Sequence, residues 1–265
     1  MTTPQKRTIQ SLLLLVCLGI VSTDTHAQTS LLDRILERGE IRIGTTGDYK
    51  PFTYLNPETG SYEGMDIDAA HMLGEALGVR VRFVPTTWST LSEDTLGDRF
   101  DLAMGGITRT LERQKILALT EPYVTIGKSP LIRKSDRNRF RGLQDMDRPW
   151  VRIGVNRGGT NEAFVRANIR QATIVMFENN LDVQPAVAEG DVDVMFTDNV
   201  EAVIYARQNP VLYALSPGEP LTREDIGYMT VRDDQAFLNW LNLWLYQMQQ
   251  KGTLDALRSK WIGEY

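Results

Sequence analysis

Three short segments of the sequence combine glycine or hydroxyl residues with a charged side chain, a combination that binds small anions. In the first, Gly105 and Gly106 would let the backbone approach a ligand closely, and Thr108 offers a hydroxyl. Arg113 follows one turn into a predicted helix, where its guanidinium can form two parallel hydrogen bonds to a carboxylate. A turn followed by a surface arginine explains the same residues about as well.

The second segment reads GGTNE and consists of Gly158, Gly159, Thr160, Asn161 and Glu162. Glycines followed by a capping residue and a helix expose backbone N–H groups that bind an anion. Glu162 would lie in the first turn of that helix. A capping carboxylate that faces solvent is the simpler interpretation of Glu162, and a catalytic acid is the alternative.

The third segment is Thr197-Asp198, at the end of a predicted strand. The Asp198 carboxylate could hold an ammonium or a hydroxyl group. An N-cap for the next helix accounts for it equally well.

The elements that would position these segments follow an alternating pattern, in which short apolar runs are followed by helical spacing. Strands are expected at residues 41–44, 79–84, 100–104, 129–132, 151–155, 172–177, 192–196 and 227–231. Helices are expected at residues 66–77, 111–118, 161–168, 181–189, 200–207 and 236–250, with a short one ending at Trp261. This order predicts mainly parallel sheets covered by helices.

A polar stretch at residues 133–139 separates two similar halves of this pattern. We therefore predict an α/β fold of two lobes with a ligand cleft between them. The first lobe would span residues 28–133 and be completed by residues 230–265, and the second would span residues 134–229. Ligands of open parallel sheets gather beyond the carboxyl ends of the strands, where the three segments lie.

The N-terminus has the three parts of a secretory signal: Lys6 and Arg7, an apolar run over residues 12–20, and small residues before a cut after Ala27. The apolar run is shorter than a membrane span requires. Cys17 lies inside that run, which argues against lipidation. We expect residues 1–27 to be a signal peptide and the mature protein to be periplasmic, with no attachment to the membrane.

Removing Lys6, Arg7 and Asp24 from the 29 basic and 34 acidic residues leaves a net charge of −6. The chain has no basic block, so nucleic acid is not an expected partner. The mature part has no cysteine, and its single histidine, His71, lies in a helical pattern. These counts argue against a thiolate nucleophile, a Ser-His-Asp site and a multi-histidine metal site.

Segments over nearly the whole mature chain resemble type II periplasmic binding proteins for polar amino acids. They are LDRILERGEIRIGTTGDYKPF (32–52), GMD (64–66), DRFDLAMGGITRTLER (98–113), PY (122–123) and TD (197–198). The resemblance implies that Thr108 and Arg113 bind an α-carboxylate and that Gly106 contributes backbone. It also implies that Thr160 reaches the ligand from the second lobe and that Asp198 binds an α-amino group.

A closer resemblance is to the periplasmic cyclohexadienyl dehydratases. It rests on TTGDYKPF (45–52), TW (87–88), DRFDLAMGGI (98–107), LERQ (111–114), GKSP (127–130) and GGTNEAFVRANI (158–169). The resemblance implies that Glu162 is a general acid. One departure is visible, because residues 225–228 lack a lysine that is expected there.

The resemblance implies a decarboxylating dehydratase that converts prephenate to phenylpyruvate, L-arogenate to L-phenylalanine, or both, without a cofactor. Glu162 would protonate the leaving hydroxyl, with a pKa raised by desolvation. Thr108 and Arg113 would bind one carboxylate of the substrate, and Lys128 and the helix start at Thr160-Asn161 would bind the second. Tyr49 and Trp88 would pack against the ring. Asp198 would orient a hydroxyl or amino group.

The alternative is a non-catalytic amino-acid receptor that delivers its ligand to an ABC permease. Both interpretations require Arg113. Neither determines whether the chain forms a homo-oligomer.

Overall fold

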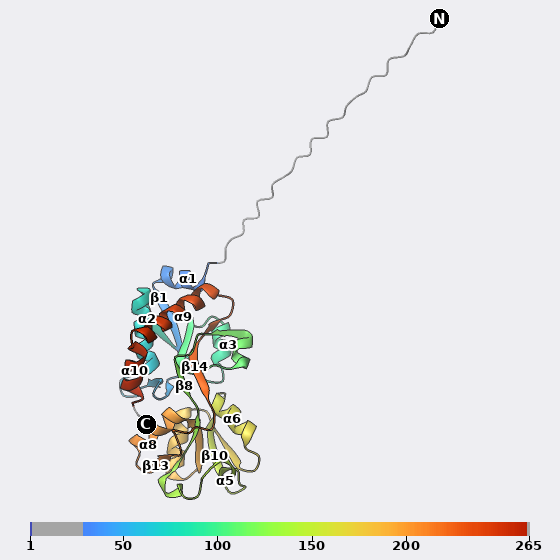
Figure 1. Ribbon diagram of the computed structural model, residues 1–265, viewed down its shortest axis with the longest axis vertical. Coiled ribbons are helices and arrows are strands. Elements are labelled where there is room, and N and C mark those ends of the chain that lie inside the picture. The colour runs from blue at the N-terminus through green and yellow to red at the C-terminus, as the bar shows by residue number, and fades with distance from the viewer. Residues whose placement is uncertain (2–28, 264–265) are drawn as a thin grey trace.

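A computed structural model describes residues 29–263 of the 265-residue chain, together with Met1. The expected signal peptide, residues 1–27, therefore lies outside the described residues apart from Met1. The described chain forms two α/β lobes along the long axis of the molecule (Figure 1). This arrangement confirms the predicted two-lobed α/β fold.

The sheet of the first lobe has the strand order β5-β1-β6-β14-β7, and β8 also pairs with β14. Strands β5 and β6 run parallel to β1, whereas β14 is antiparallel to its neighbours. The strands are β1 (Glu40–Thr45), β5 (Arg80–Pro85), β6 (Leu102–Thr108), β7 (Leu117–Leu119), β8 (Val124–Ile126) and β14 (Glu224–Val231). A separate small sheet consists of β2 (Asp48–Tyr49), β3 (Thr53–Leu55) and β4 (Tyr62–Glu63).

The sheet of the second lobe has the order β11-β10-β12-β9-β13. Its first three strands are parallel, and β9 runs antiparallel between β12 and β13. The strands are β9 (Lys128–Arg133), β10 (Arg152–Asn156), β11 (Thr173–Phe177), β12 (Val194–Asp198) and β13 (Leu212–Ala214).

Helices cover both sheets, and the ends of several follow local sequence signals. Ser30 caps the first helix by accepting a hydrogen bond from the Asp33 N–H, and Gly78 ends the second with a left-handed φ of 69°. The first lobe contains α1 (Leu31–Arg38), α2 (Met65–Leu77), α3 (Leu91–Leu96), α4 (Leu111–Ile116), α9 (Gln235–Gln250) and α10 (Thr253–Trp261). The second contains α5 (Leu143–Met146), α6 (Thr160–Asn168), α7 (Val183–Glu189), α8 (Asn199–Gln208) and 3₁₀ turns at Lys134–Asp136 and Asn180–Asp182.

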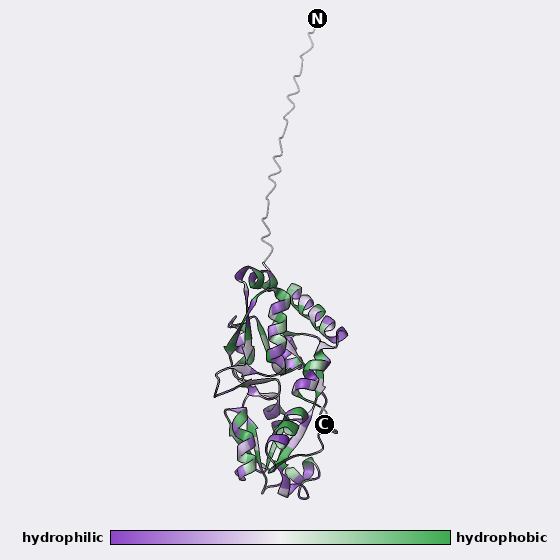
Figure 2. Ribbon diagram, turned by 90° about the vertical axis from the view of Figure 1, so that its left-hand side faces the viewer, coloured by the Kyte–Doolittle hydropathy of each residue, from purple (hydrophilic) through white to green (hydrophobic). Residues whose placement is uncertain are grey.

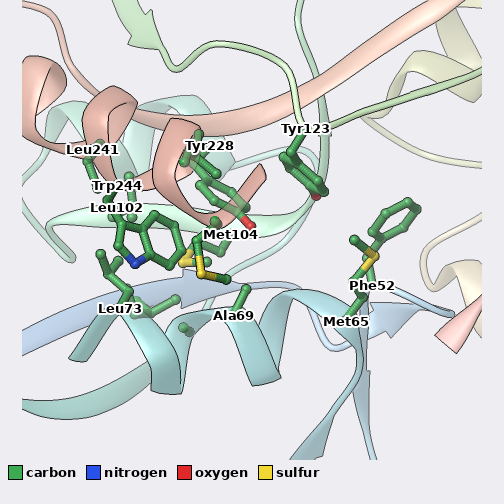
Figure 3. Close-up of a cluster of buried hydrophobic side chains, with 14 of the residues drawn as sticks. Phe52, Met65, Ala69, Leu73, Leu102, Met104, Tyr123, Tyr228, Leu241 and Trp244 are labelled. Atoms are coloured by element: carbon green, nitrogen blue, oxygen red, sulfur yellow. The ribbon is translucent and has the colours of Figure 1, made fainter. Parts of the chain in front are cut away.

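Each lobe has its own hydrophobic core, and polar residues lie mainly on the outer faces of the helices (Figure 2). In the first lobe, side chains of α2, β6 and α9 pack together (Figure 3). The labelled members of that cluster are Phe52, Met65, Ala69, Leu73, Leu102, Met104, Tyr123, Tyr228, Leu241 and Trp244. No helix within residues 29–263 has the length and hydropathy that a membrane span needs.

Most expected elements have bounds that differ by one or two residues, and the strand expected at 100–104 instead runs over Leu102–Thr108. The helix expected at 111–118 ends at Ile116, because the next three residues form β7 against β14. The last strand, expected at 227–231, already begins at Glu224, because β14 also pairs with β8.

The sheet pairings also correct the expected lobe boundaries. Strand β9 was expected to close the first lobe, but it pairs with β12 and β13 of the second. The crossover at Gly127 therefore precedes the polar stretch at 133–139. On the return, β14 joins the first sheet from Glu224 onward, so the expected boundary after residue 229 is several residues late.

In each sheet, the first of the parallel strands lies between the next two parallel strands of its lobe. The order is β5-β1-β6 in the first lobe and β11-β10-β12 in the second. Ligands of open α/β sheets bind beyond the carboxyl ends of strands at such a change of direction. The topology therefore places the binding region beyond β1 and β6 on one side and beyond β10 and β12 on the other.

Candidate functional site

A cavity lies at this position, and residues of both lobes line it. Seven of the residues expected from the sequence are among them. The lining residues are Tyr49, Trp88, Gly106, Thr108, Asn156, Gly159, Thr160, Asn161, Asn180 and Asp198. The cavity has room for little more than one water molecule, about 20 Å³, so this conformer has a nearly closed cleft.

Lys128 and Asp198 form a buried ion pair beside the cavity. They are direct cross-strand partners at the ends of β9 and β12, and the Lys128 Nζ lies 2.8 Å from the Asp198 Oδ1. Both side chains are nearly inaccessible to solvent, at 0% and 4% exposure. The ammonium also donates to the Thr160 hydroxyl at 3.0 Å and lies 3.3 Å from the Glu224 carboxylate. Lys128 therefore lies beside the cavity with partners for its hydrogen-bond donors, and its expected role of binding a substrate carboxylate stays a prediction.

Two aromatic side chains from the first lobe form one wall of the cavity. The rings of Tyr49 and Trp88 pack edge to face, with centroids 5.8 Å apart. The Tyr49 hydroxyl donates to the Asp198 Oδ2 of the other lobe, and the Trp88 Nε1 donates to Asp48 at 2.9 Å. Burial, followed by the Asp198 charge, raises the pKa of Tyr49 well above its usual value, so the phenol keeps its proton.

Asp66, in the first turn of α2, accepts a hydrogen bond from the glycine segment of the first lobe. Gly106 has a left-handed φ of 72°, and its N–H donates to the Asp66 Oδ2 at 2.7 Å. The hydroxyls of Tyr123 and Tyr228 donate to the same carboxylate at 2.6 and 3.4 Å. Burial raises the pKa of Asp66 to about 6, although these hydrogen bonds favour the ionised form. Tyr228 thus lies in the segment where the resemblance led us to expect a lysine.

The GGTNE segment meets the first lobe across the cleft. The hydroxyls of Thr160 and Thr108 lie 3.3 Å apart, and the Asn161 side chain donates to Asn156 at 3.4 Å. Thr160 begins α6, and Gly159, Thr160 and Asn161 line the cavity, so the start of that helix lies at the cavity wall.

Glu162 does not have the properties expected of a general acid in this structure. Its carboxylate accepts from the Gly158 N–H at 2.7 Å and from Arg166 at 2.7 Å, one turn along α6. Burial would raise its pKa, but these hydrogen bonds and the guanidinium outweigh burial and lower it. The expected rise in the pKa of Glu162 is therefore wrong, and the simpler interpretation, a helix-capping carboxylate, matches its contacts.

Arg113 lies behind the cavity wall in this conformer. Its Nη1 donates to the main-chain oxygen of Thr108 at 2.6 Å, and Arg113 is not among the lining residues. Burial lowers the pKa of Arg113 to about 10, so the guanidinium remains charged near neutral pH. In this conformer it therefore supports Thr108 from behind.

Three functional candidates escaped the sequence analysis: Asn156, Asn180 and Glu201. Asn156 ends β10 and Asn180 follows β11, so the strand-end rule that selected the three segments would also have selected both. Gly159 lies in a segment already selected. Glu201 carried no such signal, because a glutamate in the first turn of a helix normally faces solvent.

Glu201 is fully buried in the second lobe, directly behind the cavity. It accepts hydrogen bonds from the Asn180 side chain at 2.8 Å, from the Tyr205 hydroxyl at 2.9 Å and from the Thr197 hydroxyl. Burial raises its pKa to about 8, and the neighbouring carboxylates of Asp198 and Asp48 also raise it. Glu201 is therefore mostly protonated near neutral pH.

The described residues contain no group of three or more His, Cys, Asp or Glu side chains that could hold a metal ion. The charged and polar groups of the site instead suit an organic acid. Lys128, Arg113, the hydroxyls of Thr108 and Thr160, and the start of α6 are all donors.

Most of the chain matches known proteins. A family model described as "Bacterial extracellular solute-binding proteins, family 3" matches residues 41–264. A cyclohexadienyl dehydratase of Pseudomonas aeruginosa is 41% identical over 249 residues, which are 94% of this chain and 92% of that protein. The L-cystine-binding protein TcyJ of Escherichia coli is 25% identical and spans 92% of this chain and 90% of its own.

Solved structures give the same result. An ancestral amino-acid-binding protein, described as a precursor of cyclohexadienyl dehydratase, matches with a TM-score of 0.83 and 37% identity over 88% of this chain and all of its own. An ancestral cyclohexadienyl dehydratase is 51% identical, with a TM-score of 0.57, over 90% of this chain and 99% of its own.

Proposed function

The chain belongs to the bacterial extracellular solute-binding proteins of family 3, and we propose that within this family it is a decarboxylating dehydratase of cyclohexadiene acids. Its substrates would be prephenate, L-arogenate or both, and its products phenylpyruvate and L-phenylalanine. The observation that carries the proposal is a buried carboxyl group with a raised pKa, Glu201, directly behind a donor-rich cleft. The 41% identity to a cyclohexadienyl dehydratase supports it.

The reaction requires one general acid and groups that bind and orient the substrate. A proton is transferred to the ring hydroxyl, and the C–O bond breaks to release water. The bond between the ring and its carboxylate breaks as CO2 leaves, and its electron pair completes the aromatic ring. Aromaticity supplies the driving force, and general-acid assistance typically contributes about 10²–10⁴-fold.

We assign the acid to Glu201 in place of Glu162. Its pKa of about 8 keeps Glu201 protonated at neutral pH, whereas the contacts of Glu162 lower its pKa. Asn180 covers Glu201 and also donates to the main-chain oxygen of Asp48 in the first lobe, at 2.9 Å. Separation of the lobes breaks that contact but not the bond from Asn180 to Glu201, so the proposed role requires the bound substrate to displace the Asn180 side chain from Glu201. The Glu201 carboxylate then regains a proton from solvent.

The cationic and N–H groups would hold the two carboxylates of the substrate. Thr108 and Arg113 of the first lobe would bind one carboxylate, and the start of α6 at Thr160 of the second lobe would bind the other. The Asn180 and Asn161 Oδ1 atoms have no hydrogen-bond partner within the described residues, so either can accept the hydrogen of the substrate hydroxyl.

We also propose that the protein works in the periplasm after removal of residues 1–27. Membership of an extracellular solute-binding family supports an exported location. The reaction would need no metal or organic cofactor, because one acid and a set of carboxylate-binding groups are sufficient for it.

The decisive experiment is to purify the mature chain, add prephenate or L-arogenate, and follow the formation of phenylpyruvate or L-phenylalanine. We expect turnover well above the spontaneous rate. A protein that forms neither product but binds a natural amino acid tightly would instead be a receptor for a transporter.

A further inference from the structure

We infer that the cleft discriminates against an amino group on the substrate side chain, so that the protein prefers the 2-oxo acid prephenate to the 2-amino acid L-arogenate. The inference rests on the proposed function, because it names which of the two substrate classes the same site favours. Its basis is the ion pair between Lys128 and Asp198, because Asp198 is the carboxylate that would otherwise bind a substrate ammonium.

Asp198 is the residue that the family resemblance assigns to an α-amino group. In this chain its Oδ1 is paired with the Lys128 Nζ at 2.8 Å, inside the protein. The two residues face each other across β12 and β9 of a single sheet. The pair therefore belongs to the second lobe alone, and opening the cleft does not separate it.

The other oxygen of Asp198 accepts a hydrogen bond from the Tyr49 hydroxyl, which comes from the first lobe. Opening the cleft releases this partner only. A substrate ammonium that replaced Tyr49 would share one carboxylate with Lys128, which places two positive charges side by side in a buried site. Thr160 and Glu224 hold Lys128 in place, at 3.0 and 3.3 Å from its Nζ.

The hydrogen-bonding chemistry of the two substrates differs at this one position. An ammonium only donates, and a ketone only accepts. Both oxygens of Asp198 already accept hydrogen bonds, from Lys128 and Tyr49, and a ketone makes no demand on them. The neutral amide oxygens of Asn161 and Asn180 can accept a hydroxyl hydrogen, but they carry no charge to balance an ammonium.

The primary test is the ratio of kcat/KM for prephenate to that for L-arogenate with the mature chain. We expect a preference of about 10- to 100-fold for prephenate, because repulsion between adjacent buried cations acts against arogenate alone. Equal ratios, or a preference for arogenate, would overturn the inference.

The matched variants are Lys128→Gln and Lys134→Gln. The first removes the internal ammonium, and the second removes an exposed lysine of the same lobe. We expect Lys128→Gln to lower the prephenate-to-arogenate ratio at least about fivefold, whatever the absolute rate, while Lys134→Gln leaves it unchanged. An unchanged ratio in Lys128→Gln would contradict the role given to Lys128.

A binding measurement keeps the test independent of turnover. Phenylpyruvate and L-phenylalanine differ in the same oxo and amino groups, so calorimetric titration of the parent chain should show tighter binding of phenylpyruvate, by about tenfold or more. A chain that turns over neither substrate but shows this difference would sink the proposed function and leave the selectivity standing. Tighter binding of L-phenylalanine would overturn the selectivity, even in an active dehydratase.

Discussion

At the scale of single residues, the environment of a carboxyl group decides its chemistry. Glu162 and Glu201 both lie in the first turn of a helix, yet their pKa values shift in opposite directions. Glu162 has Arg166 and a backbone N–H as partners near the surface. Burial, together with two nearby carboxylates, favours the protonated form of Glu201, although the hydroxyls that donate to it lower its pKa.

We predict that Glu201→Gln lowers kcat for prephenate by about 10²–10⁴-fold, because the amide cannot donate a proton to the leaving hydroxyl. The change is nearly isosteric, so the fold should be retained, which circular dichroism can check. Glu162→Gln is the control and should stay within a few-fold of the parent rate. A large loss in Glu162→Gln with a small one in Glu201→Gln would restore the original assignment.

The pH dependence of kcat/KM should report the same group. Because Glu201 acts in its protonated form and its pKa is raised to about 8, activity should hold through neutral pH and fall as the pH rises past that value. Steady-state rates across the alkaline range measure this limb. Activity that stays level well above pH 8 would rule out Glu201 as the acid.

At the scale of elements, the end of β6 shows how a backbone conformation shapes the cavity. Gly105 and Gly106 both have positive φ values, 138° and 72°, and the Asp66 carboxylate holds the turn. A Cβ atom on Gly106 would lie 2.4 Å from the Tyr49 ring. Glycine is therefore required at this position both for its conformation and for the approach of the aromatic wall.

We predict that Gly106→Ala displaces the Tyr49 ring, lowers stability by roughly 2–4 kcal/mol and reduces kcat/KM, because it adds a steric clash to the left-handed strain. Gly60→Ala is the matched control. Gly60 has a similar φ of 67°, and a Cβ there would meet nothing within 4 Å. It should cost only about 1–2 kcal/mol. Urea unfolding of both variants compares them, and equal losses would show that the clash is relieved without cost.

At the scale of the whole molecule, the cleft is closed by direct contacts between the lobes. Tyr49 donates to Asp198, Thr108 meets Thr160, and Asn180 donates to the main chain of Asp48. The remaining cavity, about 20 Å³, is far smaller than the roughly 300 Å³ or more of typical ligand pockets. A substrate therefore enters only after the lobes separate, and closure follows around it.

We predict that Tyr49→Phe shifts the unliganded protein toward an open form, because it removes a buried hydrogen bond to a charged group across the cleft. Such a bond is worth about 1.5–3 kcal/mol, which corresponds to roughly 10- to 100-fold in the balance between the two forms. Small-angle X-ray scattering should show a larger radius of gyration for this variant than for Tyr54→Phe, which lies outside the cavity lining. Identical scattering of the two variants would show that other contacts hold the cleft closed.

The sequence by itself determined the two-lobed architecture and most of the cavity wall. Periodicity identifies strands and helices, and the strand-end rule selects the segments of Gly106, Thr160 and Asp198, because these signals are local along the chain. Only the tertiary structure decided the lobe membership of β9, since strand pairing depends on partners far away in the sequence.

The tertiary structure also decided which charges are free and which are paired. Arg113 donates to the main chain of Thr108, and Lys128 pairs with Asp198. Glu201 is buried. The sequence alone does not indicate any of these three contacts or environments. A pKa depends on desolvation and on neighbours in space, so it could not be predicted from a motif. For that reason, the sequence indicated a carboxylate-binding cleft, and the structure moved the proposed acid from Glu162 to Glu201.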